Sequence, residues 1–295
     1  MHVLACITAL AYAVEAAGKR GLVGVTTATS AIDNAVFIKS NQLSWVYTYG
    51  VSPPSGAQLG SLPFVPQQWG GYGVSSFTSA VSAQNLKEKY VLSFNEPDGV
   101  GHGQANMQPQ AAAQAWKTAI QPLKAQGFKL GSPGVTGAPS GMVWMKEFMG
   151  NCTGCSIDFL ALHWYGNYDG LVSHLNNYRT NFPNLNIWIT ELALPDNDAS
   201  TTLKMMQDTL TYLDNATFVD RYTWFGSFRS SQSNVGPNAA FLDANGKLTQ
   251  LGSTYLGLSS QAVSASSTSS TSSASQVANS FKLLLVLAAC ATTFL

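Results

Sequence analysis

Charge is scarce in this chain. Only 10% of its 295 residues are charged, and 15 basic residues balance 15 acidic ones. Nucleic acids and anionic membranes attract proteins through concentrated positive charge, so we expect neither as a direct partner and predict an uncharged ligand. The 11 tyrosines and 7 tryptophans suit a site that binds neutral, amphipathic molecules by stacking and hydrogen bonds.

Cysteine is also scarce, with four residues in all. Cys6 and Cys290 lie in the terminal segments discussed next, which leaves Cys152 and Cys155. No second Cys-x-x-Cys and no histidine pair is placed to complete a metal site with them. We therefore predict a local disulfide between Cys152 and Cys155 and no bound metal. A redox protein built on this pair is a distant alternative.

Both ends of the chain resemble processing signals. Residues 1–17 are apolar and end in small residues, which predicts a secretory signal peptide. Residues 259–273 are rich in serine and threonine, and residues 274–295 close the chain with an apolar tail too short for a comfortable membrane span. This order is typical of a stalk followed by a removable GPI-anchor signal. We expect a secreted protein held at the cell surface or cell wall by its lipid anchor.

Between these ends, residues 18–258 alternate between strand-like and helix-like segments, which is typical of a parallel sheet with crossover helices. The number of segments predicts an α/β fold, a single (β/α)8 TIM barrel, and we expect a monomer. A Pro- and Gly-containing segment stands between the second and third strands, so we expect a shortened loop there in place of a helix. A doubly wound open sheet is the alternative, but no Gly-x-Gly-x-x-Gly follows the first strand. The expected strands are 20–27, 44–50, 61–70, 89–98, 128–136, 156–166, 186–194 and 221–228, and the expected helices are 29–41, 75–88, 109–127, 140–150, 169–182, 198–214 and 247–258.

Two glutamates lie at the ends of apolar strand-like segments, where an ionised group is energetically costly. Glu96 and Glu191 close the apolar runs VLSFNE and NIWITE, whereas Glu88 and Glu147 lie in helical patterns as surface charges. The C-terminal ends of barrel strands form the active-site face, so the fourth and seventh strands would bring Glu96 and Glu191 to one cavity. Two carboxylates in that position suit glycoside hydrolysis. A purely structural role, with each carboxylate satisfied by arginine or backbone amides, is the alternative.

Further residues are expected around this pair. Two-residue alternation in IDFLALHWYG puts His163 and Tyr165 on the face of Phe159, where they would reach the active site. Trp188 precedes Glu191 by three residues, so we expect it to point away, toward the helices. Other candidates for contact with sugar lie at the ends of the second and third strands and in the loop after Glu96: Tyr47, Tyr49, Gln67, Gln68, Trp69 and His102.

The motifs NEPD and TEL, at the ends of the fourth and seventh expected strands, resemble those of clan A glycoside hydrolases. The chain is more closely similar to the fungal members of glycoside hydrolase family 128, which are β-1,3-glucanases. That similarity runs through KRGLVGV, WVYTYG, LPFVPQQWG, SFNEPD, CTGCSIDFLALHWYG, WITELA and YTWFGSF. The resemblance implies Glu96 as acid/base, Glu191 as nucleophile, Asn95 as the ligand of the substrate 2-hydroxyl and Trp224 as a sugar platform.

Together these features predict a retaining endo-β-1,3-glucanase that needs no cofactor and binds β-1,3-glucan polymers and oligosaccharides. Retention requires carboxyl groups about 5 Å apart, with Glu191 ionised and the pKa of Glu96 raised. Two alternatives are a glucan-remodelling transglycosylase and a cell-wall protein that binds glucan without cleaving it. Exo action also fits the sequence.

Overall fold

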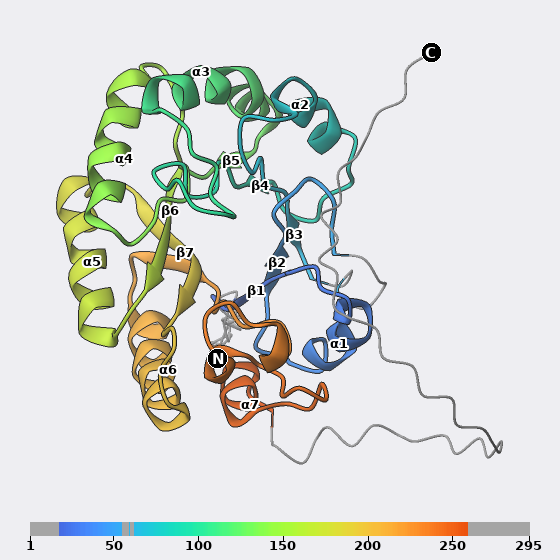
Figure 1. Ribbon diagram of the computed structural model, residues 1–295. Helices are drawn as coiled ribbons and strands as arrows, with labels where there is room; N and C mark the ends of the chain where they lie inside the picture. The colour runs from blue at the N-terminus through green and yellow to red at the C-terminus, as the bar shows by residue number, and fades with distance from the viewer. Residues whose placement is uncertain (1–17, 55–58, 60–61, 259–295) are drawn as a thin grey trace, which may run out of the picture. The chain divides into compact units, whose positions relative to one another are not determined.

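In the part of the chain that the structure describes, eight parallel strands alternate with helices at every connection but one (Figure 1). The computed structural model describes residues 18–54, 59 and 62–258, so the signal peptide, stalk and anchor signal predicted at 1–17, 259–273 and 274–295 lie outside the described residues. The strands are short except β6 and β7, and all lie within the predicted strand segments except β8, which begins two residues earlier than expected. They are β1 (Gly21–Val23), β2 (Trp45–Tyr47), β3 (Phe64–Val65), β4 (Tyr90–Val91), β5 (Lys129–Leu130), β6 (Phe159–Tyr165), β7 (Asn186–Ala193) and β8 (Val219–Tyr222).

Strand pairing follows chain order. The ladders join β1-β2-β3, β4-β5 and β6-β7-β8, and every ladder is parallel. Single parallel bridges link the three sheets: Gln67 with Leu92, Gly131 with Phe159, and Arg20 with Tyr222. The predicted α/β class with parallel strands is therefore confirmed.

The helices lie outside the strands (Figure 1). Pro109 and Pro139 occupy the first turns of α3 and α4, where the missing N–H is tolerated. The side chains of Asn167 and Asp198 cap α5 and α6. No α-helix stands between β2 and β3 in the described residues 48–54, 59 and 62–63, as expected. The helices are α1 (Ser30–Phe37), α2 (Val74–Ser82), α3 (Pro109–Ala119), α4 (Pro139–Asn151), α5 (Tyr168–Asn181), α6 (Ala199–Asn215) and α7 (Gln250–Leu256), with 3-10 turns η2 (Gln121–Gln126), η3 (Ser230–Gln232) and η4 (Pro237–Ala239).

A buried aromatic cluster joins several strands at the end away from the two glutamates. The Trp188 ring lies 4.1 Å from that of Phe159, 5.0 Å from Tyr90 and 5.1 Å from Trp45. The Arg221 guanidinium lies 4.5 Å from the Trp188 ring. The expectation that Trp188 faces the helices is wrong, because its ring neighbours come from β2, β4 and β6.

A β-bulge in β7 explains the error. Leu162 pairs with Ile189, but the next residue of β6, His163, pairs with Glu191, so Thr190 is extra in β7. An extra residue shifts the two-residue alternation by one position. Trp188 and Glu191 therefore both point toward the space inside the strands, although regular alternation would put them on opposite faces.

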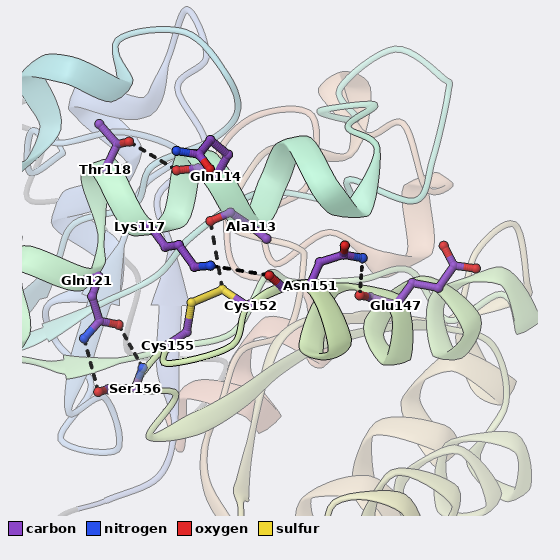
Figure 2. Close-up of a disulfide and its surroundings, with 10 residues drawn as sticks. All are labelled: Ala113, Gln114, Lys117, Thr118, Gln121, Glu147, Asn151, Cys152, Cys155 and Ser156. Atoms are coloured by element: carbon purple, nitrogen blue, oxygen red, sulfur yellow. Dashed lines mark hydrogen bonds between the residues drawn. A yellow bond between two sulfur atoms is a disulfide. The ribbon is translucent and has the colours of Figure 1, made fainter.

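Cys152 and Cys155 form a disulfide, which confirms the predicted pairing (Figure 2). It closes the turn that leaves α4 on the way to β6. Next to it, the Ser156 amide donates to the Gln121 side chain at 2.8 Å, which ties this turn to η2. Within the described part of the chain, no helix has the length and apolar character needed to cross a membrane.

Candidate active site

A cavity of about 860 Å³ opens where the strands end and contains both predicted catalytic glutamates. Its wall combines carboxylates, amides and aromatic rings, the mixture that binds a polar ligand with apolar faces. Segments after β2, β3, β4, β5, β7 and β8, together with the end of β6, contribute to it. The lining residues are Tyr49, Trp69, Asn95, Glu96, His102, Gly103, Gln104, Thr136, Gly137, Ala138, Trp164, Tyr165, Glu191, Pro195, Phe225, Asn234 and Val235.

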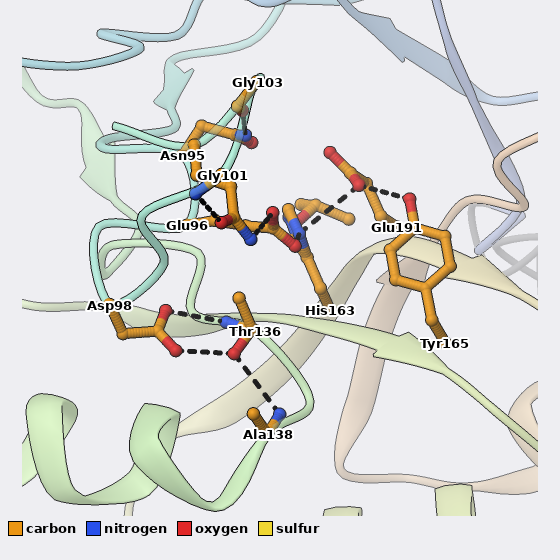
Figure 3. Close-up of polar contacts among 12 residues, drawn as sticks. Asn95, Glu96, Asp98, Gly101, Gly103, Thr136, Ala138, His163, Tyr165 and Glu191 are labelled. Carbon is orange, nitrogen blue, oxygen red and sulfur yellow. Dashed lines mark hydrogen bonds and ion pairs between the residues drawn. The ribbon is translucent and has the colours of Figure 1, made fainter. Parts of the chain in front are cut away.

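Glu191 is held by two tyrosines. The hydroxyl of Tyr49 donates to Glu191 Oε1 at 2.7 Å, and that of Tyr165 donates to Oε2 at 2.5 Å. Figure 3 shows Tyr165 and Glu191 facing each other. Glu191 is buried, with 5% of its surface exposed. Because both oxygens accept from phenols, the arrangement suits an ionised carboxylate whose position is fixed.

Glu96 stands just after β4 on an unusual backbone. Its φ of 44° is left-handed, a conformation that a glutamate adopts only where the surroundings impose it. The Glu96 amide donates to the Gly134 carbonyl at 2.7 Å. Its Oε1 lies 2.9 Å from His163 Nδ1, and its Oε2 accepts from Gln104 Nε2 at 2.9 Å. Glu96 is thus aimed into the cavity by a strained turn and two side-chain partners.

The two carboxylates share one histidine (Figure 3). His163 Nδ1 also lies 3.4 Å from Glu191 Oε2. One ligand-type atom each of Glu96, His163 and Glu191 lies within 4.8 Å of the others, and among the described residues only this group could hold a metal ion. Protein groups already contact all four carboxylate oxygens, an arrangement that suits proton transfer.

The pKa values in this cluster follow from its contacts. Burial raises the pKa of Glu96, but hydrogen bonding and charge from His163, with the Gln104 amide, outweigh it, so the pKa of Glu96 is lowered. Burial raises the pKa of Glu191, which the His163 charge and the two phenols only partly oppose. Burial lowers the pKa of His163, but the charges of Glu191 and Glu96 raise it above the ordinary value.

This order corrects the expectation of a raised pKa at Glu96. Glu96 accepts hydrogen bonds on both oxygens, from His163 and Gln104, which favours its ionised form. The lowered pKa of Glu96 and the raised pKa of His163 both favour a proton on the ring rather than on Glu96. Sequence alone could not show this, because the donors that set the order come from a later strand and from a loop.

Several predicted contact residues line the cavity: Tyr49, Trp69, Asn95, His102 and Tyr165. Asn95 Nδ2 donates to the Gly103 carbonyl at 3.0 Å, while its buried Oδ1 has no partner in the protein. A buried acceptor without a partner is costly, which favours a ligand hydroxyl as its partner. Tyr49, expected only to be a wall of the cavity, bonds directly to Glu191.

Other predicted contacts do not line the cavity. Tyr47 is fully buried and donates to the Thr190 carbonyl at 2.7 Å. Gln67 and Gln68 are buried, and their amides donate to backbone carbonyls. These contacts satisfy the NH2 groups of both side chains, whereas Gln67 Oε1 is buried without a partner in the protein.

Trp224 also departs from its expected role as a sugar platform. Only 1% of its surface is exposed, and its indole N–H donates to the Ala239 carbonyl at 2.9 Å. The neighbouring Phe225 lines the cavity instead. β8 ends at Tyr222, so Trp224 lies in the segment after the strand, and the role that the resemblance implied for it is not met. The Phe225 amide donates to the Leu192 carbonyl at 2.8 Å, which positions this residue beside the end of β7.

Sequence reasoning missed Gln104. The residue belongs to the glycine-rich segment GVGHGQ, of which only His102 stood out as a possible contact. The glycines at alternate positions were the available signal, since closely packed loops often require them. Nothing in the local sequence indicated that the Gln104 amide reaches Glu96.

Paired carboxylates in a cavity at the ends of parallel strands, flanked by hydroxyl donors and aromatic rings, define a glycosidase-type active site. The chain belongs to the glycosyl hydrolase catalytic core family, which matches residues 22–255.

The chain is also similar to a fission-yeast protein over most of its length. Alkali-sensitive linkage protein 1 of Schizosaccharomyces pombe is 33% identical over 254 residues, which are 81% of this chain and 44% of that protein. The chain thus spans less than half the length of this relative.

Solved structures of glycoside hydrolase family 128 superpose well. A curdlan-specific exo-β-1,3-glucanase from Blastomyces gilchristii is 29% identical (TM-score 0.66; 82% of this chain, 99% of that one). An endo-β-1,3-glucanase from Pseudomonas viridiflava is 28% identical (TM-score 0.64; 82% and 98%). An oligosaccharide-binding protein from Cryptococcus neoformans is 26% identical (TM-score 0.67; 82% and 93%).

Proposed function

We propose that this protein is a family 128 retaining endo-β-1,3-glucanase built on a (β/α)8 barrel. The observation that carries the proposal is the Glu96–Glu191 pair, with an oxygen of each residue within 4.8 Å of the other. Retaining glycosidases place their carboxyl groups about 5 Å apart, while inverting enzymes leave a wider gap for water. The bridges that link the three sheets in sequence support the barrel.

In the proposed mechanism, a Glu191 oxygen attacks the anomeric carbon as the glycosidic C–O bond breaks. The leaving oxygen takes a proton from Glu96. Glu96 then removes a proton from water, whose oxygen attacks the same carbon and releases Glu191. The two phenols on Glu191 hold the nucleophile in place.

His163 supplies the proton that Glu96 needs in the first step. Its Nδ1 lies 2.9 Å from Glu96 Oε1, so a proton can pass along one hydrogen bond. Glu96 is neutralised by the transfer, and the ring returns to its neutral state. Asn95 completes the site, since its free Oδ1 can accept from the sugar 2-hydroxyl, where hydrogen bonds strengthen in the transition state.

The test is hydrolysis of laminarin by the wild type, Glu96→Gln and Glu191→Gln, with Glu147→Gln as the matched control. Glu147 is exposed on α4, so its variant should keep full activity. Loss of either catalytic group should lower kcat by about 10² to 10⁴. Short laminari-oligosaccharides of several lengths from the start of digestion would support endo action, and glucose alone would indicate exo action.

A glucan-binding protein without turnover is the second candidate. The Cryptococcus neoformans neighbour, described as oligosaccharide-binding, favours it. In that case the wild type would bind laminarin but release no sugar. A transglycosylase is distinguished by the appearance of products longer than the substrate, because the glycosyl-enzyme is then intercepted by a sugar.

We further propose that the protein is a secreted monomer and is anchored at the cell surface beside its polymer. The Ser/Thr-rich segment and apolar tail of residues 259–295 support an anchor. Phosphatidylinositol-specific phospholipase should release the protein from intact cells, provided the inositol is not acylated. A mature chain that still ends at Leu295 by mass spectrometry would exclude the anchor.

A further inference from the structure

The loop of residues 99–104 folds over Glu96, and its main contact is the side chain of Gln104. Gln104 Nε2 donates to Glu96 Oε2 at 2.9 Å. Its Oε1 accepts from the Gly101 amide at 2.6 Å. The backbone N–H of Gln104 also donates to the Gly101 carbonyl at 3.2 Å. Gln104 therefore joins the loop backbone to the carboxylate.

These contacts determine which way the side-chain amide faces. A backbone N–H can only donate, so the group that Gly101 contacts must be the Gln104 carbonyl oxygen. The NH2 group is then the one turned toward Glu96. A protonated Oε2 would place its hydrogen against another donor, so Gln104 favours the ionised carboxylate.

The loop is shaped around this side chain. A methyl group at Gly99 would lie 2.2 Å from Gln104 Cδ, and one at Gly101 would lie 3.0 Å from Oε1. Gly103 has a left-handed φ of 83°, and its carbonyl accepts from Asn95 Nδ2 at 3.0 Å. Glycine at 99 and 101 thus lets the backbone approach the amide closely, while Gly103 supplies a left-handed residue whose carbonyl attaches the loop to the residue before Glu96.

We propose that Gln104 is a positioning residue that holds Glu96 Oε2 and favours its ionised form, and so sets the pH range over which Glu96 acts as an acid. This inference rests on the proposed function, in which Glu96 is the acid/base. The other titratable groups around Glu96 are Tyr47 from β2, His163 and Tyr165 from β6, Glu191 from β7 and His102 at the cavity wall. Of the two side chains bonded to Glu96, only Gln104 has a constant charge.

Two variants of Gln104 distinguish an effect on the ionisation of Glu96 from an effect on the structure of the loop. Gln104→Met has similar length but removes both side-chain hydrogen bonds. Gln104→Glu keeps an acceptor for the Gly101 amide, loses the donor to Glu96 and adds a carboxyl group beside it. Gln110→Met is the matched control, because Gln110 is exposed on α3. Carbon-13 NMR of glutamate side chains, with Glu96 assigned by Glu96→Gln, reports the titration of Glu96 in the full protein whether or not it cleaves glucan.

The donor lowers the pKa of Glu96, so its loss should raise that pKa by about one to two units in Gln104→Met, since hydrogen bonds to charged groups contribute about 1.5–3 kcal/mol and one pKa unit corresponds to about 1.4 kcal/mol. Gln104→Glu should raise it further, and the control should leave it unchanged. The limb of the pH profile of kcat/KM on laminari-oligosaccharides that reports Glu96 should move upward in the same order, because Glu96 then stays protonated to higher pH.

If Gln104→Glu titrates and acts like the wild type while Gln104→Met loses activity equally at every pH, Gln104 has a structural role and the proposal is wrong. An unchanged Glu96 pKa in both variants would also overturn it. By contrast, shifted titration in a wild type that releases no sugar would leave the effect of Gln104 on Glu96 standing and would defeat the proposed glucanase function.

Discussion

His163 Nδ1 lies 2.9 Å from Glu96 Oε1, and the same nitrogen is within 3.4 Å of Glu191. The buried His163 ring thus contacts both carboxylates. Without it, two ionised carboxylates would repel each other in a site that is largely shielded from water. With a proton on His163, the cluster carries a single net negative charge, which makes two buried carboxylates tolerable. The same proton is positioned to reach the leaving group through Glu96.

The roles of the two glutamates can be told apart by stereochemistry. In Glu96→Ala, a substrate with an activated leaving group should still form the glycosyl-enzyme, and azide should then give the β-glycosyl azide. In Glu191→Ala, azide should enter from the vacated face and give the α-azide. NMR of the products decides between them. The opposite pairing of products and variants would mean that the roles are reversed.

Tyr165→Phe should impair Glu191, the proposed nucleophile, without removing it. The phenol stabilises ionised Glu191, so its loss should raise the pKa of Glu191 and move the acidic limb of kcat/KM to higher pH. We expect kcat/KM to fall about 10- to 100-fold, as for loss of one hydrogen bond to a charge. Tyr72→Phe is the control, since Tyr72 is 90% exposed. An unshifted limb would show that Tyr165 does not stabilise the charge.

His163 should make stability depend on pH. Because its pKa is raised in the folded protein, its contribution is fully present below the unfolded value of about 6.5 and is lost as the pH rises through the folded value. Urea unfolding of wild type and His163→Gln at pH 6 and pH 9 measures it. The difference in unfolding free energy should be smaller at pH 9. An equal difference at both pH values would mean that folding does not raise the pKa of His163, and a larger difference at pH 9 would mean that folding lowers it.

Loss of the disulfide should have a modest effect. Cys152→Ser with Cys155→Ser opens a very short loop, for which the chain-entropy relation gives about 2 kcal/mol. Calorimetry should show a lower Tm, while activity on laminarin stays unchanged at temperatures well below it. Two free thiols or bound zinc in the wild-type protein would contradict the predicted oxidised pair.

Much of the fold could be predicted because short stretches of the sequence indicate each strand and helix. Strand-like runs alternate with helical patterns, and prolines begin α3 and α4. The positions of Glu96 and Glu191 also followed, since a charged residue that ends an apolar strand is conspicuous and the ends of parallel strands converge. The Cys152–Cys155 disulfide could also be predicted, because the two cysteines are only three residues apart in the sequence.

Only the tertiary structure determined two kinds of feature. One depends on a one-residue shift in strand register, and the other depends on contacts with residues far away in the sequence. The extra Thr190 in β7 turned Trp188 inward with Glu191, and the early end of β8 brought Phe225 rather than Trp224 to the cavity. The pKa order of the two glutamates was likewise beyond the sequence. A pKa depends on burial and on donors within a few ångströms, and those of Glu96 come from β6 and from a loop whose fold only the assembled protein defines.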